Sequence, residues 1–174
     1  MKRKMYVLLV LVLALVVGCS SESGKGETEN LNSDEMKKLV HDYTVRNVTA
    51  ASASITSEEL IVTDENKNVT TYKLPEDEFF VSIAPFVNQT HPCDNHSLTG
   101  CQGELVEEEF TVQIQDSNGT IILDEKKQTE ANGFIDLWLP RNETFTVTIS
   151  NDQKQAISEI ANGDNTCITT MQLS

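Results

Sequence analysis

The chain alternates apolar and polar residues in the stretch Phe110-Thr111-Val112-Gln113-Ile114-Gln115, and then turns through Asp116-Ser117-Asn118-Gly119 into the apolar run Thr120-Ile121-Ile122-Leu123. Strict alternation is typical of a strand with one buried face, because successive side chains point to opposite faces of a sheet. An Asn-Gly turn between two such runs is a strong hairpin signal. The stretch therefore predicts an antiparallel β-hairpin and indicates a mainly β protein.

Strand signals of the same kind recur on both sides of this hairpin. They are short, are separated by residues that favour turns, and cover residues 60–63, 69–74, 79–87, 134–139, 145–149 and 167–173. About seven short strands at this spacing predict an antiparallel β-sandwich or an open barrel, which we place at residues 60–174. The side chains expected in its core include Phe79, Phe86, Ile114, Trp138, Val147 and Ile149.

The segment before these strands has a helical periodicity. Ser33 can cap a helix, and the apolar residues that follow recur at the spacing of one helix face, at Met36, Leu39, Val40 and Tyr43. This pattern predicts one short amphipathic helix at about residues 34–46. We therefore assign residues 33–59 to a short helical segment that precedes the β domain.

The first residues indicate export. Three basic residues precede an apolar run at 7–17, which is too short to span a bilayer permanently. The run ends in Val16-Val17-Gly18-Cys19, which resembles a bacterial lipobox, where the cysteine is diacylated and becomes the mature N-terminus. We predict a signal peptide at 1–18, lipidation of Cys19, and a flexible polar tether at 19–32. The alternative is an ordinary secreted protein with one extra cysteine.

The charge of the chain limits its partners. The formal net charge is −14, and loss of Lys2, Arg3 and Lys4 with the signal peptide would take it to −17. Nucleic acid binding is excluded, because phosphates need a basic surface. Docking on anionic lipid is also disfavoured, so the acyl chains on Cys19 are the expected contact with the membrane. We expect the protein on the outer face of the bacterial cytoplasmic membrane.

Two of the three histidines and two of the four cysteines lie within fourteen residues, at His91, Cys93, His96 and Cys101. Thiolates and imidazoles are the donors that Cu(I) and Zn(II) prefer. If residues 91–93 are extended, His91 and Cys93 point to the same face and can address one ion. The stretch is expected to form a loop or a strand edge, because Pro92 has no N–H to donate.

Three segments of the chain carry a resemblance to a known family. The segments are residues 90–105, which begin Thr90-His91-Pro92-Cys93, residues 131–142, which include Trp138, and residues 166–173, which include Cys167. They resemble the CueP family of extracytoplasmic copper-binding proteins, over a span from about residue 60 to the end of the chain. Separately, Asn132-Gly133-Phe134 and the run that follows resemble the prealbumin-like strands of carboxypeptidase regulatory domains, which bears on the fold only.

The family resemblance favours copper bound by Cys93, Cys101 and Cys167, with help from His91 and His96. Lipidation of Cys19 would leave these three cysteines, an odd number that suits a thiolate metal site better than a disulfide framework. Three alternatives remain open. They are a structural Zn(II) site of three cysteines and one histidine, a Cys93–Cys101 disulfide with Cys167 buried as an apolar residue, and a Cys–His nucleophile.

The function expected from these features is capture of Cu(I) for sequestration or delivery in copper homeostasis. Cu(II) oxidises thiolates, so a reduced Cys93/Cys101 pair could turn two Cu(II) into two Cu(I) while forming a disulfide. Such a reaction is stoichiometric, so we do not expect an enzyme. The expected partners are a copper-accepting protein or a thiol reductant. The alternative function is a structural or adhesive lipoprotein. For the metal carrier we expect all three sulfurs at one rim of the sandwich, with His91 or His96 nearby.

Overall fold

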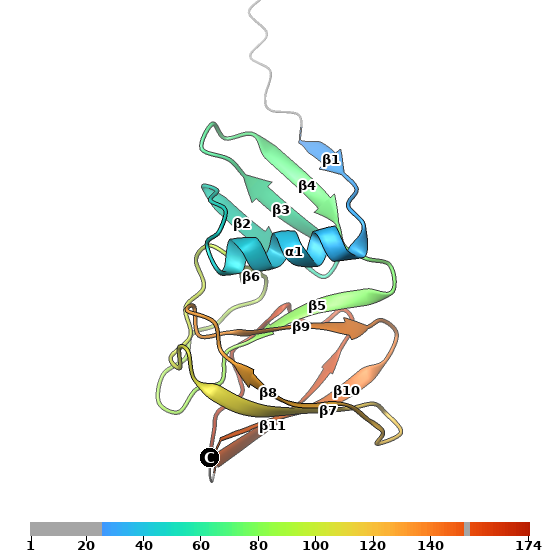
Figure 1. Cartoon of the computed structure of the whole chain (residues 1–174), viewed down its shortest axis with the longest axis vertical. Coiled ribbons are helices and arrows are strands. Elements are labelled where there is room, and N and C mark those ends of the chain that lie inside the picture. Colours follow the sequence, from blue (N-terminus) through green and yellow to red (C-terminus); the bar gives the residue numbers. More distant parts are fainter. Residues whose placement is uncertain (1–25, 152–153) are drawn as a thin grey trace, which may run out of the picture.

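The computed structural model describes residues 26–151 and 154–174. The predicted signal peptide and the lipidation site at Cys19 lie outside these residues. Within the described residues, no helix is both long enough and apolar enough to cross a bilayer. The chain folds into two parts, an N-terminal sheet with one helix and a C-terminal sandwich (Figure 1).

The N-terminal part is a five-stranded sheet in the order β1-β4-β3-β2-β6. Its elements are β1 (Glu27–Glu29), helix α1 (Ser33–Thr44), β2 (Ser52–Ile55), β3 (Glu59–Thr63), β4 (Val69–Lys73) and β6 (His96–Ser97). The last of these strands comes from the Cys–His stretch and pairs with β2 in an antiparallel manner. One edge strand of the N-terminal sheet therefore comes from residues that follow β5 in the sequence.

The C-terminal part consists of two further sheets. One has the order β12-β5-β9 and is built from β5 (Glu78–Ile83), β9 (Ile135–Pro140) and β12 (Cys167–Ile168). The other has the order β11-β10-β7-β8 and is built from β7 (Glu109–Gln115), β8 (Ile121–Gln128), β10 (Thr144–Asn151) and β11 (Lys154–Ala161). The predicted mainly β fold with one short helix is confirmed, and β7 and β8 are the hairpin of the alternating stretch.

Strand β5 is buried on both of its faces, which explains why its sequence is almost entirely apolar. Phe79, Val81 and Ile83 point into the core between the two sandwich sheets. Phe80 points the other way and packs with Met36 and Val40 of α1 in a second core. Strand β5 therefore lies between the two cores and contributes side chains to both.

The helix begins where the sequence provides a capping box. The Asn32 side chain accepts a hydrogen bond from the Glu35 N–H at 3.0 Å, and the Glu35 carboxylate accepts one from the Asn32 N–H at 3.1 Å. This reciprocal pair satisfies two backbone donors that the first turn leaves free. The cap is one residue earlier than the predicted Ser33, and the helix ends at Thr44, two residues before the predicted end.

Several predicted boundaries differ from the structure. Strand β1 lies within the predicted tether, and β2 lies within the segment assigned as helical, because both complete the sheet that starts from β3 and β4. The strand predicted over 79–87 ends at Ile83, and the one predicted over 167–173 ends at Ile168. A single bridge between Phe86 and Gln172 continues their pairing.

Of the six side chains predicted in the core, four are buried and two are half-buried. The buried four are Phe79, Ile114, Val147 and Ile149. Phe86 and Trp138 are half-buried. Trp138 lies at the junction with α1, where its ring meets Phe80 edge-on at 5.2 Å between centroids and the Lys37 ammonium lies 5.9 Å from its centre.

Candidate metal centre

The three cysteines of the domain meet at one end of β12. Cys93 and Cys167, which are 74 positions apart in the sequence, form a disulfide with their Cα atoms 5.6 Å apart. The Sγ atom of Cys101 lies 3.4 Å from that of Cys93. Among the described residues Cys101 is the one free cysteine. The structure therefore brings together the three sulfurs that the sequence analysis singled out.

The Cys93–Cys101 disulfide considered as an alternative is not formed, because β12 carries Cys167 to Cys93. Strand β12 runs parallel to β5, with Cys167 opposite Ser82. The Cys167 N–H donates to the Asp94 carbonyl oxygen at 3.1 Å, which fixes the backbone of the two cysteine segments side by side. Cys167 is buried, but as a disulfide partner of Cys93 rather than as an unpaired apolar residue.

Thr166 connects the cysteine site to the N-terminal sheet. Its hydroxyl accepts a hydrogen bond from the His96 N–H at 2.9 Å and donates one to the Ile55 carbonyl oxygen at 2.6 Å. The threonine is buried, so losing either partner would leave a polar group unpaired at a cost of about 1–3 kcal/mol. Nothing in the sequence pattern indicated this role, since its partners are 70 and 111 positions away.

Cys101 is positioned by a tight turn that starts at Ser97. The Cys101 N–H donates to the Ser97 carbonyl oxygen at 3.0 Å, and the Ser97 N–H points back at the Cys101 sulfur at 3.3 Å. Burial raises the pKa of the Cys101 thiol, and the Ser97 N–H opposes that rise because it favours the thiolate. A cationic metal would favour the thiolate much more strongly, since coordinated thiols lose their proton.

Two glycines in contact set the path of the chain after Cys101. A Cβ atom placed on Gly103 would lie 2.6 Å from the Gly133 carbonyl oxygen, and one placed on Gly133 would lie 2.9 Å from the Gly103 backbone. Gly133 also has a φ of +78°, which a side chain would make unfavourable. The close approach allows the Gly103 N–H to donate to the Asn132 carbonyl oxygen at 2.7 Å.

The two histidines of the stretch belong to different groups of potential ligands. His91 is half-buried and forms one potential ligand group with Cys93 and Cys101. His96 is fully buried and forms a second group with Cys101 and Cys167. Within each group the potential ligand atoms lie within 4.8 Å of one another. We call these the outer set and the inner set, and they share Cys101.

His96 is an unusual buried residue because neither of its ring nitrogens has a hydrogen-bond partner within the described part of the chain. Its ring packs against Phe134 with 4.5 Å between centroids and against Phe80 with 6.2 Å. Burial lowers its pKa to about 4, with a smaller contribution from His91, so the ring is neutral at physiological pH. A neutral imidazole with a free nitrogen is a good ligand for copper or zinc.

Other potential donors lie elsewhere. His41 is exposed on α1 and Met171 is buried in the sandwich core. Glu104 lies near the site, but its carboxylate is engaged with backbone N–H groups of the segment that leads to His91. No pattern in the sequence predicted a role for this glutamate.

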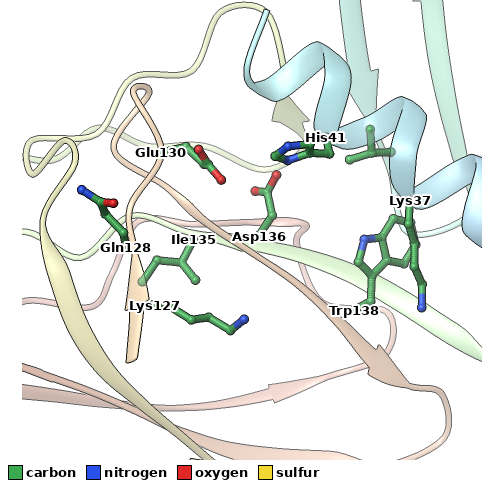
Figure 2. A pocket seen from close by; sticks show the side chains of 9 residues that line it. Lys37, His41, Lys127, Gln128, Glu130, Ile135, Asp136 and Trp138 are labelled. Atoms are coloured by element: carbon green, nitrogen blue, oxygen red, sulfur yellow. The ribbon is translucent and has the colours of Figure 1, made fainter. Parts of the chain in front are cut away.

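A second polar site lies between α1 and β9, in a cavity of about 440 Å³ (Figure 2). Asp136 accepts hydrogen bonds from the Ser82 hydroxyl at 2.6 Å and the Thr44 hydroxyl at 2.9 Å. Figure 2 shows His41 and Glu130 around its carboxylate. Burial raises the pKa of Asp136 despite the two hydroxyl donors, and Glu130 raises it further while His41 lowers it. No pattern in the sequence predicted this site.

Comparison with known proteins identifies relatives of the chain. The family described as periplasmic copper-binding protein CueP matches residues 35–172. The crystal structure of S.CueP is similar at 39% sequence identity and a TM-score of 0.73, over 80% of this chain and 88% of that one. Among curated proteins no significant match was found.

Proposed function

Because the chain belongs to the CueP family of periplasmic copper-binding proteins, we propose that it captures Cu(I) with Cys93, Cys101 and Cys167, assisted by His91 and His96. The observation that carries this proposal is the sharing of Cys101 between the outer and inner sets. Thiolate sulfur and imidazole nitrogen are soft to borderline donors, and Cu(I) prefers them to carboxylates and water.

The disulfide supports a proposed reaction of the thiols with Cu(II). In the reduced protein the Cys93 and Cys167 thiols give one electron to each of two Cu(II) ions, release two protons, and form the disulfide seen in the structure. Two Cu(I) ions are the other product. We therefore propose Cys93 and Cys167 as the pair that reduces Cu(II), in place of the Cys93/Cys101 pair considered from the sequence. The reaction is stoichiometric and the protein is not an enzyme unless a reductant restores the thiols.

The disulfide state leaves a smaller set of donors for Cu(I). Cys101 keeps its thiol, His96 keeps a neutral ring whose nitrogens have no hydrogen-bond partner among the described residues, and His91 lies close to the same sulfur. Reduction of the disulfide adds two thiolates at the same place. Retention of Cu(I) should therefore be tightest in the reduced protein, and oxidation would loosen the ion for transfer to a copper-accepting protein.

The disulfide can be approached from outside the domain. A cavity of about 410 Å³ is lined by both bonded cysteines and by the loop of residues 163–165, with Glu159 at its side. A thiol reductant could reach the sulfurs there, because Cys93 is only half-buried. We propose a thiol reductant and a copper acceptor as the two partners of this surface.

We further propose that the domain is anchored to the outer face of the cytoplasmic membrane by acyl chains on Cys19. The support is the lipobox-like Val16-Val17-Gly18-Cys19 and the polar residues that follow it. Cys19→Ala should release the protein from membranes or leave it unprocessed. Unchanged membrane association and unchanged gel mobility would contradict the anchor.

The copper proposal is tested by Cu(I) competition with the mature chain, residues 19–174 carrying Cys19→Ser. The fully reduced chain should retain one equivalent of Cu(I) against a Cu(I) chelator. A matched chain that also carries serine at Cys93, Cys101 and Cys167 should lose it. No retention by the reduced chain would contradict the proposal. Retention of Zn(II) in preference to Cu(I) would favour the zinc alternative.

A further inference from the structure

Glu104 joins two loop segments that carry different ligands. It lies three residues after Cys101, and its carboxylate accepts hydrogen bonds from the N–H groups of Val87 at 2.7 Å and Asn88 at 2.9 Å. The Asn88 side-chain amide donates to the other carboxylate oxygen at 3.1 Å. Residues 87–91 form what we call the His91 arm, which runs from Val87 to the histidine of the outer set.

The His91 arm is fixed to the C-terminal segment along its other side. The Leu173 N–H donates to the Phe86 carbonyl oxygen at 2.8 Å, just before the arm begins. Within the arm, the Thr90 hydroxyl donates to the Thr169 carbonyl oxygen at 2.6 Å. These contacts locate the arm relative to β12, but they do not connect it to the segment of Cys101. The Glu104 carboxylate makes that connection.

Glu104 is itself held at a fixed position. The preceding Gly103 is in close contact with Gly133 and donates its N–H to the Asn132 carbonyl oxygen at 2.7 Å. The carboxylate is thus supported from the turn at residues 132–133, which precedes β9, and it reaches across to the arm. Between the two segments lies a cavity of about 280 Å³, with His91 and Glu104 both on its wall.

The hydrogen bonds keep the carboxylate charged. They lower the pKa of Glu104 to about 2, with the Asn88 N–H as the largest cause and the Val87 N–H next. A neutral amide in its place would offer one acceptor oxygen instead of two, and its NH₂ group would face backbone donors. A glutamine is therefore nearly the same shape but cannot make the same clamp.

We propose that Glu104 is a positioning residue for copper, which holds the His91 arm so that the His91 ring faces Cys93 and Cys101. The inference rests on the proposed copper function, and it adds a residue that does not touch the ion. Without the clamp the arm remains tied to the C-terminal segment, through the Thr90 hydroxyl and through the Gln172 side chain, which donates to the Val87 carbonyl oxygen at 3.0 Å. His91 would then contribute less to copper retention, whereas the three cysteines and His96 would be unaffected.

The test is a double-mutant cycle between Glu104 and His91. The mature chain (residues 19–174, Cys19→Ser), fully reduced, is compared with Glu104→Gln, His91→Ala and both together, by Cu(I) competition. Each single variant should weaken retention about threefold or more, and the double variant should be no weaker than His91→Ala alone. Glu108→Gln removes the same charge from an exposed glutamate in the same loop and should change nothing.

Effects of the two substitutions that simply add, or no effect of Glu104→Gln in a chain that retains copper, would overturn the inference. A second measurement needs no copper. The His91 ring resonances in NMR spectra of the metal-free chain should shift in Glu104→Gln and stay in place in Glu108→Gln. If the parent chain fails to retain Cu(I), the proposed function fails, and unchanged His91 resonances would then overturn the positioning role separately.

Discussion

The sulfur of Cys101 lies 3.4 Å from the sulfur of Cys93, although Cys93 is already bonded to Cys167. A free thiol at this distance from a disulfide can attack it, so the bond could move between the three cysteines by thiol–disulfide exchange. Burial raises the pKa of the Cys101 thiol, which keeps it protonated and slows that attack. The observed pairing should therefore exchange slowly, while all three sulfurs stay within reach of one metal ion.

The first prediction concerns this pairing. In the oxidised, metal-free mature chain with Cys19→Ser, thiol titration should find one free thiol, and three after reduction. Peptide mapping under non-reducing conditions should recover the segment of Cys93 linked to that of Cys167. A linked pair of Cys93 and Cys101 would show that the exchange runs to the other product and would contradict the pairing described above.

The second prediction asks whether His96 binds copper or serves only as a core residue. Replacement of this buried ring by leucine removes two nitrogens that have no hydrogen-bond partner within the described residues. The free energy of unfolding should change by at most about 1 kcal/mol in either direction, because a polar cost and aromatic contacts are lost together. Retention of Cu(I) should nevertheless fall. His41→Leu, an exposed position on α1, is the matched control and should leave retention unchanged.

A large loss of stability in His96→Leu with unchanged Cu(I) retention would contradict this assignment. It would show that His96 serves the core and that the ion is held by the cysteines and His91 alone.

The third prediction tests the close approach that sets the path after Cys101. Gly103→Ala places a methyl group 2.6 Å from the Gly133 carbonyl oxygen, so the loop must move. Overpacking of this kind costs about 1–3 kcal/mol, and here it should also weaken Cu(I) retention because Cys101 moves with the loop. Gly26→Ala, whose methyl would be 3.7 Å from its nearest neighbour, is the control. Equal stability and retention in the two variants would contradict the proposed constraint.

The fourth prediction concerns pH. The folded state raises the pKa of Asp136 above its usual value of 3.8, so the folded protein binds a proton there more tightly than the unfolded chain. The proton on Asp136 therefore stabilises the folded state. This contribution to the free energy of unfolding is complete below pH 3.8 and is lost as the pH rises through the raised pKa. Asp136→Asn should remove this pH dependence, which urea unfolding at a series of pH values measures. The charges that face the group, His41 and Glu130, stay in place.

One result of the same unfolding series on the Asp136→Asn chain would contradict this prediction. If its stability changes with pH as steeply as that of the parent chain above pH 3.8, the carboxyl of Asp136 does not titrate as described.

The sequence was most informative where a local pattern determines the structure. The alternation at residues 110–115 and the apolar positions of α1 follow directly from strand and helix periodicity, and both were predicted. Strand β6 was not predicted, because two residues of the Cys–His stretch pair with β2 only in the folded chain. The short strand β1 was not predicted for the same reason, because its polar residues are extended only through their pairing with β4.

The sequence indicated which side chains gather at the candidate site, but not how they are arranged. Thiols and imidazoles are recognisable by residue type, so five potential donors could be named from the sequence and the family resemblance. The disulfide between Cys93 and Cys167 depends on the pairing of β12 with β5, and no local sequence pattern predicts that pairing. The supporting residues Thr166, Glu104 and Asp136 are common polar types, and their partners lie far away in the sequence.

The most direct test of the central claim is X-ray absorption spectroscopy at the copper edge on the fully reduced mature chain (residues 19–174, Cys19→Ser) loaded with one equivalent of Cu(I). The account predicts a first shell dominated by sulfur, together with a nitrogen contribution that decreases in His91→Ala or His96→Leu. Cys101→Ser should lower the sulfur count. A first shell of oxygen and nitrogen only, or a spectrum that Cys101→Ser leaves unchanged, would contradict capture of copper by these cysteines.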